Sequence, residues 1–301
     1  MAKARKILRR QRAVGSIRDV TNTMEMVATA RFKQAHDLVV ASRPYTDGLA
    51  TMVGQLAARI EGRDKKKLRH PLMRPRKRAN THVLMVLTSD RGLCGAHNHA
   101  VLRAAMARLG ELVRDKRAAE LHVVGRRGSQ YLRFRGFEVD HEYTDVGDVP
   151  QFEPIGRLAD GIRDRFLAGE VAGFEITYMQ FISSGRQEPG TVKILPMADL
   201  APPPPPRGEH ELETEPLPYD FFPSAEELLM ELLPFTVRLR TYQCFLDAAC
   251  SEHVARMGAM RAATDNADEM LRDLRVTYNR LRQSQITTEL AEIMGGREGV
   301  R

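Results

Sequence analysis

The sequence has 301 residues, of which 43% are hydrophobic and 28% charged, enough for one large or two modest globular domains. Residues 1–80 carry 20 Lys/Arg against 6 Asp/Glu, a net charge of +14, whereas the whole chain carries +7. No segment approaches the about eighteen apolar residues of a membrane span, and no apolar stretch follows the basic N-terminus, so we expect neither a spanning segment nor a secretory signal.

The first segment, residues 1–60, is predicted to be a long amphipathic helix. Pro44 should kink or interrupt this helix, after which the helical pattern resumes as far as Ile60. Polar interruptions of its apolar seam fall at Arg10, Thr21 and Arg31. The expected inward positions follow a heptad spacing and are Ile7, Val14, Ile17, Met24, Ala28, Ala35 and Leu38.

Residues 61–80 are rich in Lys and Arg and contain Pro71 and Pro75, which predicts a basic linker and a domain boundary. From residue 81 to 200 the pattern changes to short apolar runs that alternate with amphipathic stretches. This alternation predicts a three-layer, Rossmann-like α/β domain. We expect strands at 82–87, 121–124, 136–143, 174–182 and 192–195, and helices at 100–117, 129–134 and 155–167.

Residues 201–223 contain a run of five prolines followed by an acidic stretch, and they predict an extended connector. Ser224 is then expected to cap the N-terminus of a second long helix, which occupies residues 224–301. From Phe235 to Met294 this helix has no proline and would be roughly 90 Å long. Its expected inward positions are Leu239, Tyr242, Leu246, Ala249, His253, Arg256, Met260, Ala263, Ala267, Met270, Leu274, Thr277 and Leu281.

The two long helices lie at opposite ends of the sequence, and neither has a partner nearby in the chain. The simplest solution is an antiparallel two-helix coiled coil formed by the N- and C-terminal helices, which carries the α/β domain. The alternative is a dimer in which each helix pairs with a copy of itself. The seam positions of His253 and Arg256 indicate either a fixed register or a place where the partner helix has diverged.

The segment Thr88–Asn98 follows a predicted strand and precedes a helix, the position of a phosphate-binding loop. It lacks both common glycine patterns of nucleotide-binding loops, so a structural turn or a contact surface is favoured. Ser89, Asp90, Cys94 and His97 do not have the spacing of a hydrolase site, and His97 with His99 lacks a third metal ligand. The other cysteines, Cys244 and Cys250, show neither a disulfide framework nor metal-ligand spacing.

The C-terminal end of the long helix combines polar and apolar residues far beyond any globular domain. Gln283, Thr287 and Glu289 alternate there with apolar side chains, namely Ile286, Leu290, Ile293 and Met294. A frayed terminus does not require such apolar residues, and we therefore expect other chains to surround this tip.

Three motifs identify the chain as similar to a known family. They are Met24-Glu-Met-Val-Ala-Thr-Ala30 with Ala41-Ser-Arg-Pro-Tyr45, Thr88-Ser-Asp-Arg-Gly-Leu-Cys-Gly95, and the stretch from Ser251 to Asn266 that continues to Met294. Over nearly its whole length the sequence resembles the gamma subunit of F-type ATP synthase. Asn22 stands where the family commonly has Lys, and no regulatory cysteine insertion of the chloroplast kind is present.

The resemblance implies a rotor shaft that couples ion flow through the membrane sector to ATP synthesis or hydrolysis by rotation. The implied partners are three alpha and three beta subunits, the epsilon subunit and the c-ring. It also implies that the chain has no catalytic residue, cofactor or metal of its own. The implied location is the cytoplasmic face of a bacterial plasma membrane. Carried over by motif, the contacts that couple the shaft to the ring are Met24, Arg256, Gln283, Thr287 and Glu289.

Three alternatives remain open at this point. One is a divergent, sodium-linked F-type ATPase, because the sequence does not give the coupling ion. A basic nucleic-acid-binding coiled-coil protein would use the charge of residues 1–80, although aromatic interleaving is absent. A nucleotide enzyme would use the loop at residues 88–98.

Overall fold

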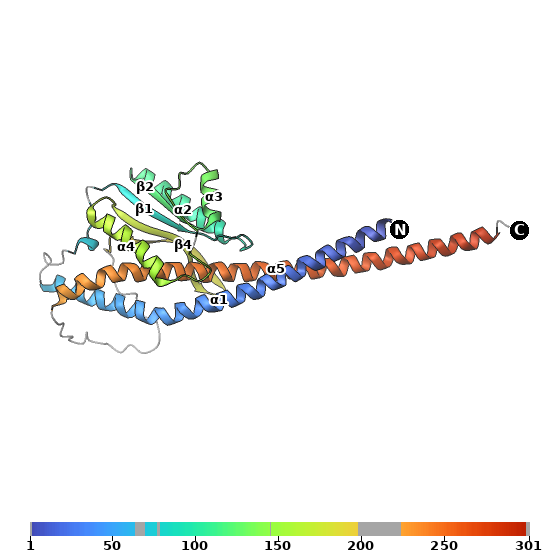
Figure 1. The fold of residues 1–301 in the computed structure, drawn as a ribbon, viewed down its shortest axis with the longest axis horizontal. Coiled ribbons are helices and arrows are strands. Elements are labelled where there is room, and N and C mark those ends of the chain that lie inside the picture. Colours follow the sequence, from blue (N-terminus) through green and yellow to red (C-terminus); the bar gives the residue numbers. More distant parts are fainter. Residues whose placement is uncertain (1, 64–69, 77–78, 145, 198–223, 299–301) are drawn as a thin grey trace. The chain divides into compact units, whose positions relative to one another are not determined.

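A computed structural model of the chain describes residues 2–63, 70–76, 79–144, 146–197 and 224–298 (Figure 1). The chain divides into two compact units. The first, the helical unit, comprises residues 1–30, 93–95 and 255–301, and the second, the α/β unit, comprises residues 31–92 and 96–254. Two long helices, α1 (Ala2–Arg63) and α5 (Ala225–Glu298), contribute to both units.

The α/β unit is built on a five-stranded sheet in the order β3-β2-β1-β4-β5. Its strands are β1 (Thr81–Leu87), β2 (Ala118–Val124), β3 (His141–Tyr143), β4 (Gly173–Ser183) and β5 (Arg186–Leu195). The first four strands pair in parallel, and β5 pairs antiparallel with β4. The five strands confirm the predicted α/β domain, with β5 longer than expected because its exposed, polar first half gave no apolar signal.

Helices cover both faces of this sheet, as expected for a three-layer domain. On one face, α2 (His97–Arg114) and α3 (Arg126–Phe134) enclose a core with Leu84, Val86 and Val123. On the other face, α4 (Phe152–Ala168) packs with parts of α1 and α5 around Val83, Met85 and the fully buried Phe166. Strand residues of alternating number therefore serve two separate cores.

The predicted basic linker is partly wrong. Helix α1 continues to Arg63, and residues 71–73 form a short 3-10 helix, η1 (Pro71–Met73). Leu72 is fully buried in the core, and its carbonyl oxygen accepts a hydrogen bond from the Met197 amide at 2.8 Å. Residues 71–73 are therefore part of the domain, and the many charges around them in the sequence concealed the apolar anchor Leu72. Residues 64–69 and 77–78, and the connector at 201–223, lie outside the described residues.

Pro44 is expected from the sequence to kink or interrupt the helix; it does not interrupt it, because α1 continues through this residue. Proline removes the amide that would serve the Val40 carbonyl. Pro44 and Val40 are both exposed, so water can serve that carbonyl instead. At the start of α5 the prediction is confirmed, since the Ser224 hydroxyl accepts a hydrogen bond from the Glu227 amide at 3.2 Å.

The N- and C-terminal helices pair antiparallel in each unit, as the sequence predicts. Within the α/β unit, Ala35 and Val39 pack with Leu246 and Cys250, and the Ser42 hydroxyl donates to Gln243 at 3.1 Å.

Within the helical unit, Val14 packs with Ala267 and Leu271. The hydroxyls of Thr21 and Thr264 are 2.8 Å apart. Residue numbers rise along α1 as they fall along α5, which is the antiparallel arrangement, and both helices come from one chain.

Half of the expected seam is displaced by one residue. Val14, Ala28, Met260 and Ala267 are buried as predicted, but the intervening positions Ile17, Met24, Leu38, Met270 and Thr277 are exposed. The positions one residue later face the partner helix instead, among them Arg18, which lies 3.6 Å from Asp268, and the buried Leu271. Both frames repeat every seven residues, and counting apolar residues selected the wrong one because the real seam contains polar side chains.

We predict that Asp247→Asn stabilises the α/β unit at neutral and alkaline pH. Burial raises the pKa of Asp247 to about 6, although a hydrogen bond from Gln243 and the charge of Arg43 oppose this shift. When the pKa of a carboxyl group is higher in the folded protein than in the unfolded chain, the folded protein loses stability as the pH rises from about 4 through 6. The advantage of the Asn variant should thus grow between pH 5 and pH 8, reaching about 1–3 kcal/mol. Urea unfolding at both pH values checks this, and a pH-independent difference would contradict it; the exposed Asp37→Asn is the control.

Candidate coupling surface of the helical unit

The helical unit exposes an apolar stripe on α1. Ile17, Val20, Met24 and Val27 are spaced three or four residues apart and therefore share one face of the helix. Each is between 38% and 57% exposed, although large apolar side chains of a paired helix normally face the partner. An apolar stripe of this kind indicates a contact surface for another protein.

A second set of exposed apolar residues follows α5 toward its C-terminal end. Ile286 and Leu290 are 45% and 55% exposed and lie one turn apart. The antiparallel register places them beyond the first residues of α1, and the red end of α5 extends past the N-terminus in Figure 1. The side chains of Ile293 and Met294 lie outside the described residues.

All five residues singled out from the sequence belong to the helical unit. Met24 is 38% exposed on the apolar stripe of α1, and Arg256 is half-buried on α5. Gln283, Thr287 and Glu289 are exposed near the end of α5, where the Thr287 hydroxyl donates to the Gln283 carbonyl at 3.0 Å. The five residues therefore fall into two groups along the paired helices. Met24 and Arg256 make up one group, and the three residues near the end of α5 make up the other.

Sequence reasoning missed Val20 and Val27 and assigned Ile17 to the interior. The available signal was the spacing of Val14, Arg18 and Thr21, which are four and three residues apart and therefore share one face of the helix. A seam that accepts arginine and threonine at these steps leaves Ile17 and Met24 on the outside.

The loop at residues 88–98 is a structural turn in the part that belongs to the α/β unit. The Ser89 carbonyl and the Asp90 carboxylate accept the amides of Arg127 and Arg126, the first residues of α3. These groups occupy the end of α3 that could otherwise bind a phosphate. The Ser89 hydroxyl donates to the Arg91 carbonyl at 2.6 Å and accepts from Asn98, so it is not poised as a nucleophile.

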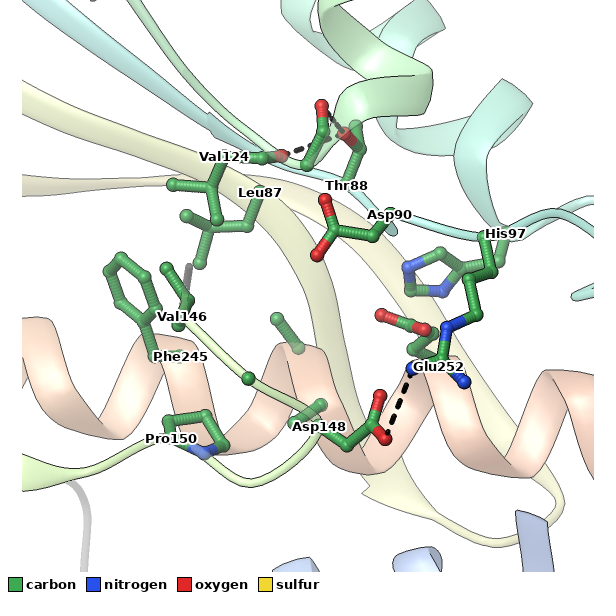
Figure 2. A pocket seen from close by; sticks show the side chains of 15 residues that line it. Leu87, Thr88, Asp90, His97, Val124, Val146, Asp148, Pro150, Phe245 and Glu252 are labelled. Carbon is green, nitrogen blue, oxygen red and sulfur yellow. Dashed lines mark hydrogen bonds and ion pairs between the residues drawn. The ribbon is translucent and has the colours of Figure 1, made fainter. Parts of the chain in front are cut away.

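A small cavity lies beside this turn. The side chains of Asp90, His97, Asp148 and Glu252 border it (Figure 2). Its volume is about 60 Å³, far below the roughly 300 Å³ of a small-molecule site, so a nucleotide does not fit. Asp148 pairs with Arg31 and Arg91 at 3.6 and 3.7 Å, which indicates a structural ion-pair cluster.

The remaining loop residues belong to the helical unit. Gly95 has a φ of +57°, and a side chain there would lie 3.9 Å from Ala259 of α5.

The cysteines of the α/β unit are buried, and burial raises the pKa of Cys244 and Cys250 to about 12. Their reactive thiolate forms are therefore strongly disfavoured.

Among the described residues, no helix combines the length and the hydropathy needed to cross a lipid bilayer. The chain is similar in fold to chains of two solved ATP synthase structures. A chain in the Euglena gracilis mitochondrial ATP synthase structure of OSCP, F1 and c-ring matches with a TM-score of 0.63 and 16% identity, covering 99% of this chain and 95% of that one. In the Tetrahymena thermophila central stalk and c-ring structure the values are 0.58 and 22%, with 81% and 99% covered.

Sequence comparison identifies the family. The family profile described as ATP synthase matches residues 3–300. The ATP synthase gamma chain of Rhodopirellula baltica is 38% identical over 300 residues, covering 100% of this chain and 99% of the relative. That of Gemmatimonas aurantiaca is 38% identical over 298 residues, covering 98% of each. The chain that carries this paired-helix unit and α/β unit therefore belongs to the ATP synthase gamma chain family.

Proposed function

We propose that this chain is the central rotor shaft that couples ion flow through the membrane sector to ATP synthesis or hydrolysis at an alpha/beta ring. The observation that carries the proposal is the exposed apolar stripe Ile17–Val27 on a helix that is already paired. Contiguous apolar surface is unfavourable in water, and a surrounding ring of subunits would cover this stripe.

The pairing of α1 and α5 in the helical unit suits the transmission of torque. Side-chain contacts tie the two helices together at several levels: the packing of Val14 against Leu271, the Thr21–Thr264 hydroxyl pair and the Arg18–Asp268 ion pair. A twisting force on one helix is therefore shared by the other. Because α1 and α5 differ in sequence, the rod presents a different face to each of the subunits around it. A rotating shaft needs such asymmetry to place three equivalent sites of a ring in different states.

We assign the contacts with the ring to two levels of the rod. Met24 and Arg256 would contact the beta subunits at one level, and Gln283, Thr287 and Glu289 at the other. Supporting this, Met24 and the residues near the end of α5 are exposed, as surfaces for a partner must be.

The proposed complex holds three alpha and three beta subunits, an epsilon subunit and a c-ring, at the cytoplasmic face of a bacterial plasma membrane. The bacterial relatives, and the presence of F1 and a c-ring in the similar Euglena gracilis structure, support this assignment. In this role the chain itself has no catalytic residue and no cofactor, and catalysis belongs to the ring.

Co-purification tests the proposal. A tagged chain, isolated from its native membrane in mild detergent, should bring alpha, beta, epsilon and c subunits with it, identified by mass spectrometry. Recovery without these subunits, together with binding to duplex DNA that weakens steeply with salt, would instead support a nucleic-acid-binding protein. A chain that lacks residues 1–30 is the matched control, since it removes the α1 side of the helical unit and should lose the ring subunits.

A further inference from the structure

A group of polar side chains lies at the β3 edge of the sheet in the α/β unit, where the sequence had not indicated a site. Glu120 and His122 are two residues apart in β2 and therefore point to the same face of the sheet. His141 of β3 is the direct neighbour of His122 in the strand pairing. The parallel register thus brings two imidazoles and one carboxylate together on one face.

The distances within this group are close to those of a metal site, and the shorter one is a hydrogen bond between His122 and Glu120 that a bound ion would replace. The Nε2 atoms of His122 and His141 lie 2.8 and 3.5 Å from Oε1 of Glu120. All three ligand atoms lie within 4.8 Å of one another. In a tetrahedral zinc site with bonds of about 2.0–2.1 Å, ligand atoms are roughly 3.3 Å apart, so small side-chain movements suffice to admit the ion.

We propose that Glu120, His122 and His141 bind a divalent transition-metal ion, with Zn²⁺ as the ion that suits the ligands best. One carboxylate and two imidazoles form a known zinc ligand set, and water would fill the fourth position. His122 is buried and His141 is half exposed, so one side of the site is preorganised and the other is open to the ion. Imidazole ligands also favour zinc over magnesium or calcium.

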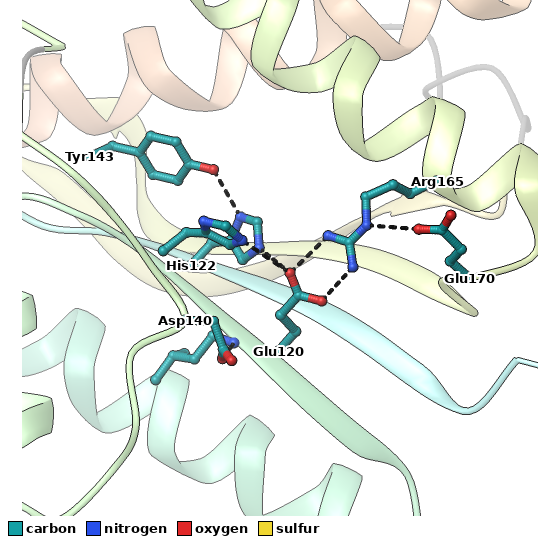
Figure 3. A network of polar contacts seen from close by, with 8 residues as sticks. Glu120, His122, Asp140, Tyr143, Arg165 and Glu170 are labelled. Carbon is teal, nitrogen blue, oxygen red and sulfur yellow. Dashed lines mark hydrogen bonds and ion pairs between the residues drawn. The ribbon is translucent and has the colours of Figure 1, made fainter.

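Two neighbouring residues, Tyr143 and Arg165, contact the ligands and orient them. The Tyr143 hydroxyl lies 3.1 Å from Nδ1 of His122, where it can hold the imidazole in the orientation that leaves Nε2 for the metal (Figure 3). Arg165 of α4 donates to both oxygens of Glu120 at 2.8 and 2.6 Å. It fixes the carboxylate, but its positive charge weakens the attraction for a cation, so the site should bind less tightly than an uncharged surrounding would allow.

Metal binding would join β2 to the short edge strand β3. β3 is three residues long and pairs with one strand only, so it is the least supported strand of the sheet. A metal ion held by both strands would slow the opening of this edge. The inference is independent of the proposed rotor function, because it concerns the sheet alone.

The test uses the full-length chain after treatment with a chelator. Calorimetric titration with Zn²⁺ should show one bound equivalent, and Co²⁺ should give the intense visible absorption of tetrahedral coordination. His141→Ala should weaken Zn²⁺ binding by about ten-fold or more, and Tyr143→Phe by about ten-fold. His99→Ala, a change at an exposed histidine of α2, should leave the affinity unchanged.

Three results would overturn the proposal: no Zn²⁺ binding, a weak octahedral Co²⁺ spectrum, or equal affinities of the wild type and His141→Ala. Melting curves of the metal-free variants exclude misfolding as the cause. As a further measurement, Zn²⁺ should slow amide hydrogen exchange in residues 141–143 of the wild type but not of His141→Ala.

Discussion

Replacing Arg108 with alanine should lower the free energy of unfolding of the α/β unit by about 3–5 kcal/mol. Arg108 of α2 donates to both oxygens of Glu175 in β4, at 2.6 and 2.7 Å. Glu175 is only 5% exposed, so removing the guanidinium leaves a buried carboxylate without its compensating charge. The loss of the residual contact with the exposed Glu111 contributes little.

Two variants separate this cause from a general weakening of α2. Arg103→Ala changes an exposed arginine on the same helix and should alter the stability by less than about 0.5 kcal/mol. Glu175→Gln, added to Arg108→Ala, removes the buried charge and should restore part of the stability. Urea unfolding followed by circular dichroism measures all four proteins, and an Arg108→Ala loss no larger than that of Arg103→Ala would show that the pair is not important.

Replacing Met24 with lysine should reduce ATP-driven ion pumping by the assembled complex by about ten-fold or more. Met24 belongs to the exposed apolar stripe of α1, which the proposed ring covers. An ammonium group placed in a dry protein contact costs several kcal/mol unless a partner charge is available, and about 1.4 kcal/mol corresponds to ten-fold in an equilibrium. The rotor positions in which this side chain contacts the ring should be affected most.

Pumping and ATP hydrolysis are measured together on membrane vesicles, so that loss of coupling is distinguished from failure to assemble. Hydrolysis that continues while pumping is lost is the expected result. Val113→Lys adds the same charge at a 70% exposed apolar residue of α2 and serves as the control. Unchanged pumping in Met24→Lys would remove the role assigned to Met24 without affecting the family assignment.

Much of the architecture follows from local patterns in the sequence. The apolar run of β1 and the spacing of the strands predict the α/β unit, because buried parallel strands require continuous apolar residues. Ser224 predicts the start of α5, because a hydroxyl at that position satisfies a free amide of the first turn. The long heptad repeats predict the pairing of α1 with α5, since neither apolar face has another partner in the chain.

The details of the surfaces depended on contacts between residues distant in sequence. Whether Ile17 or Arg18 faces α5 is decided by the partner residues across the seam, and Asp268 accepts the arginine. Leu72 is an anchor because the α/β core leaves room for it, although charged residues surround it in the sequence.

The sequence by itself determined most of the helices and strands, favoured the pairing of the two ends of the chain, and identified the family to which the protein belongs. These properties follow from periodicity and from motifs carried by neighbouring residues. Only the tertiary structure decided which apolar residues of the paired helices remain outside, and it alone joined Glu120 and His122 to His141. The physical reason is that strand pairing and helix register bring together residues that have no fixed spacing along the chain.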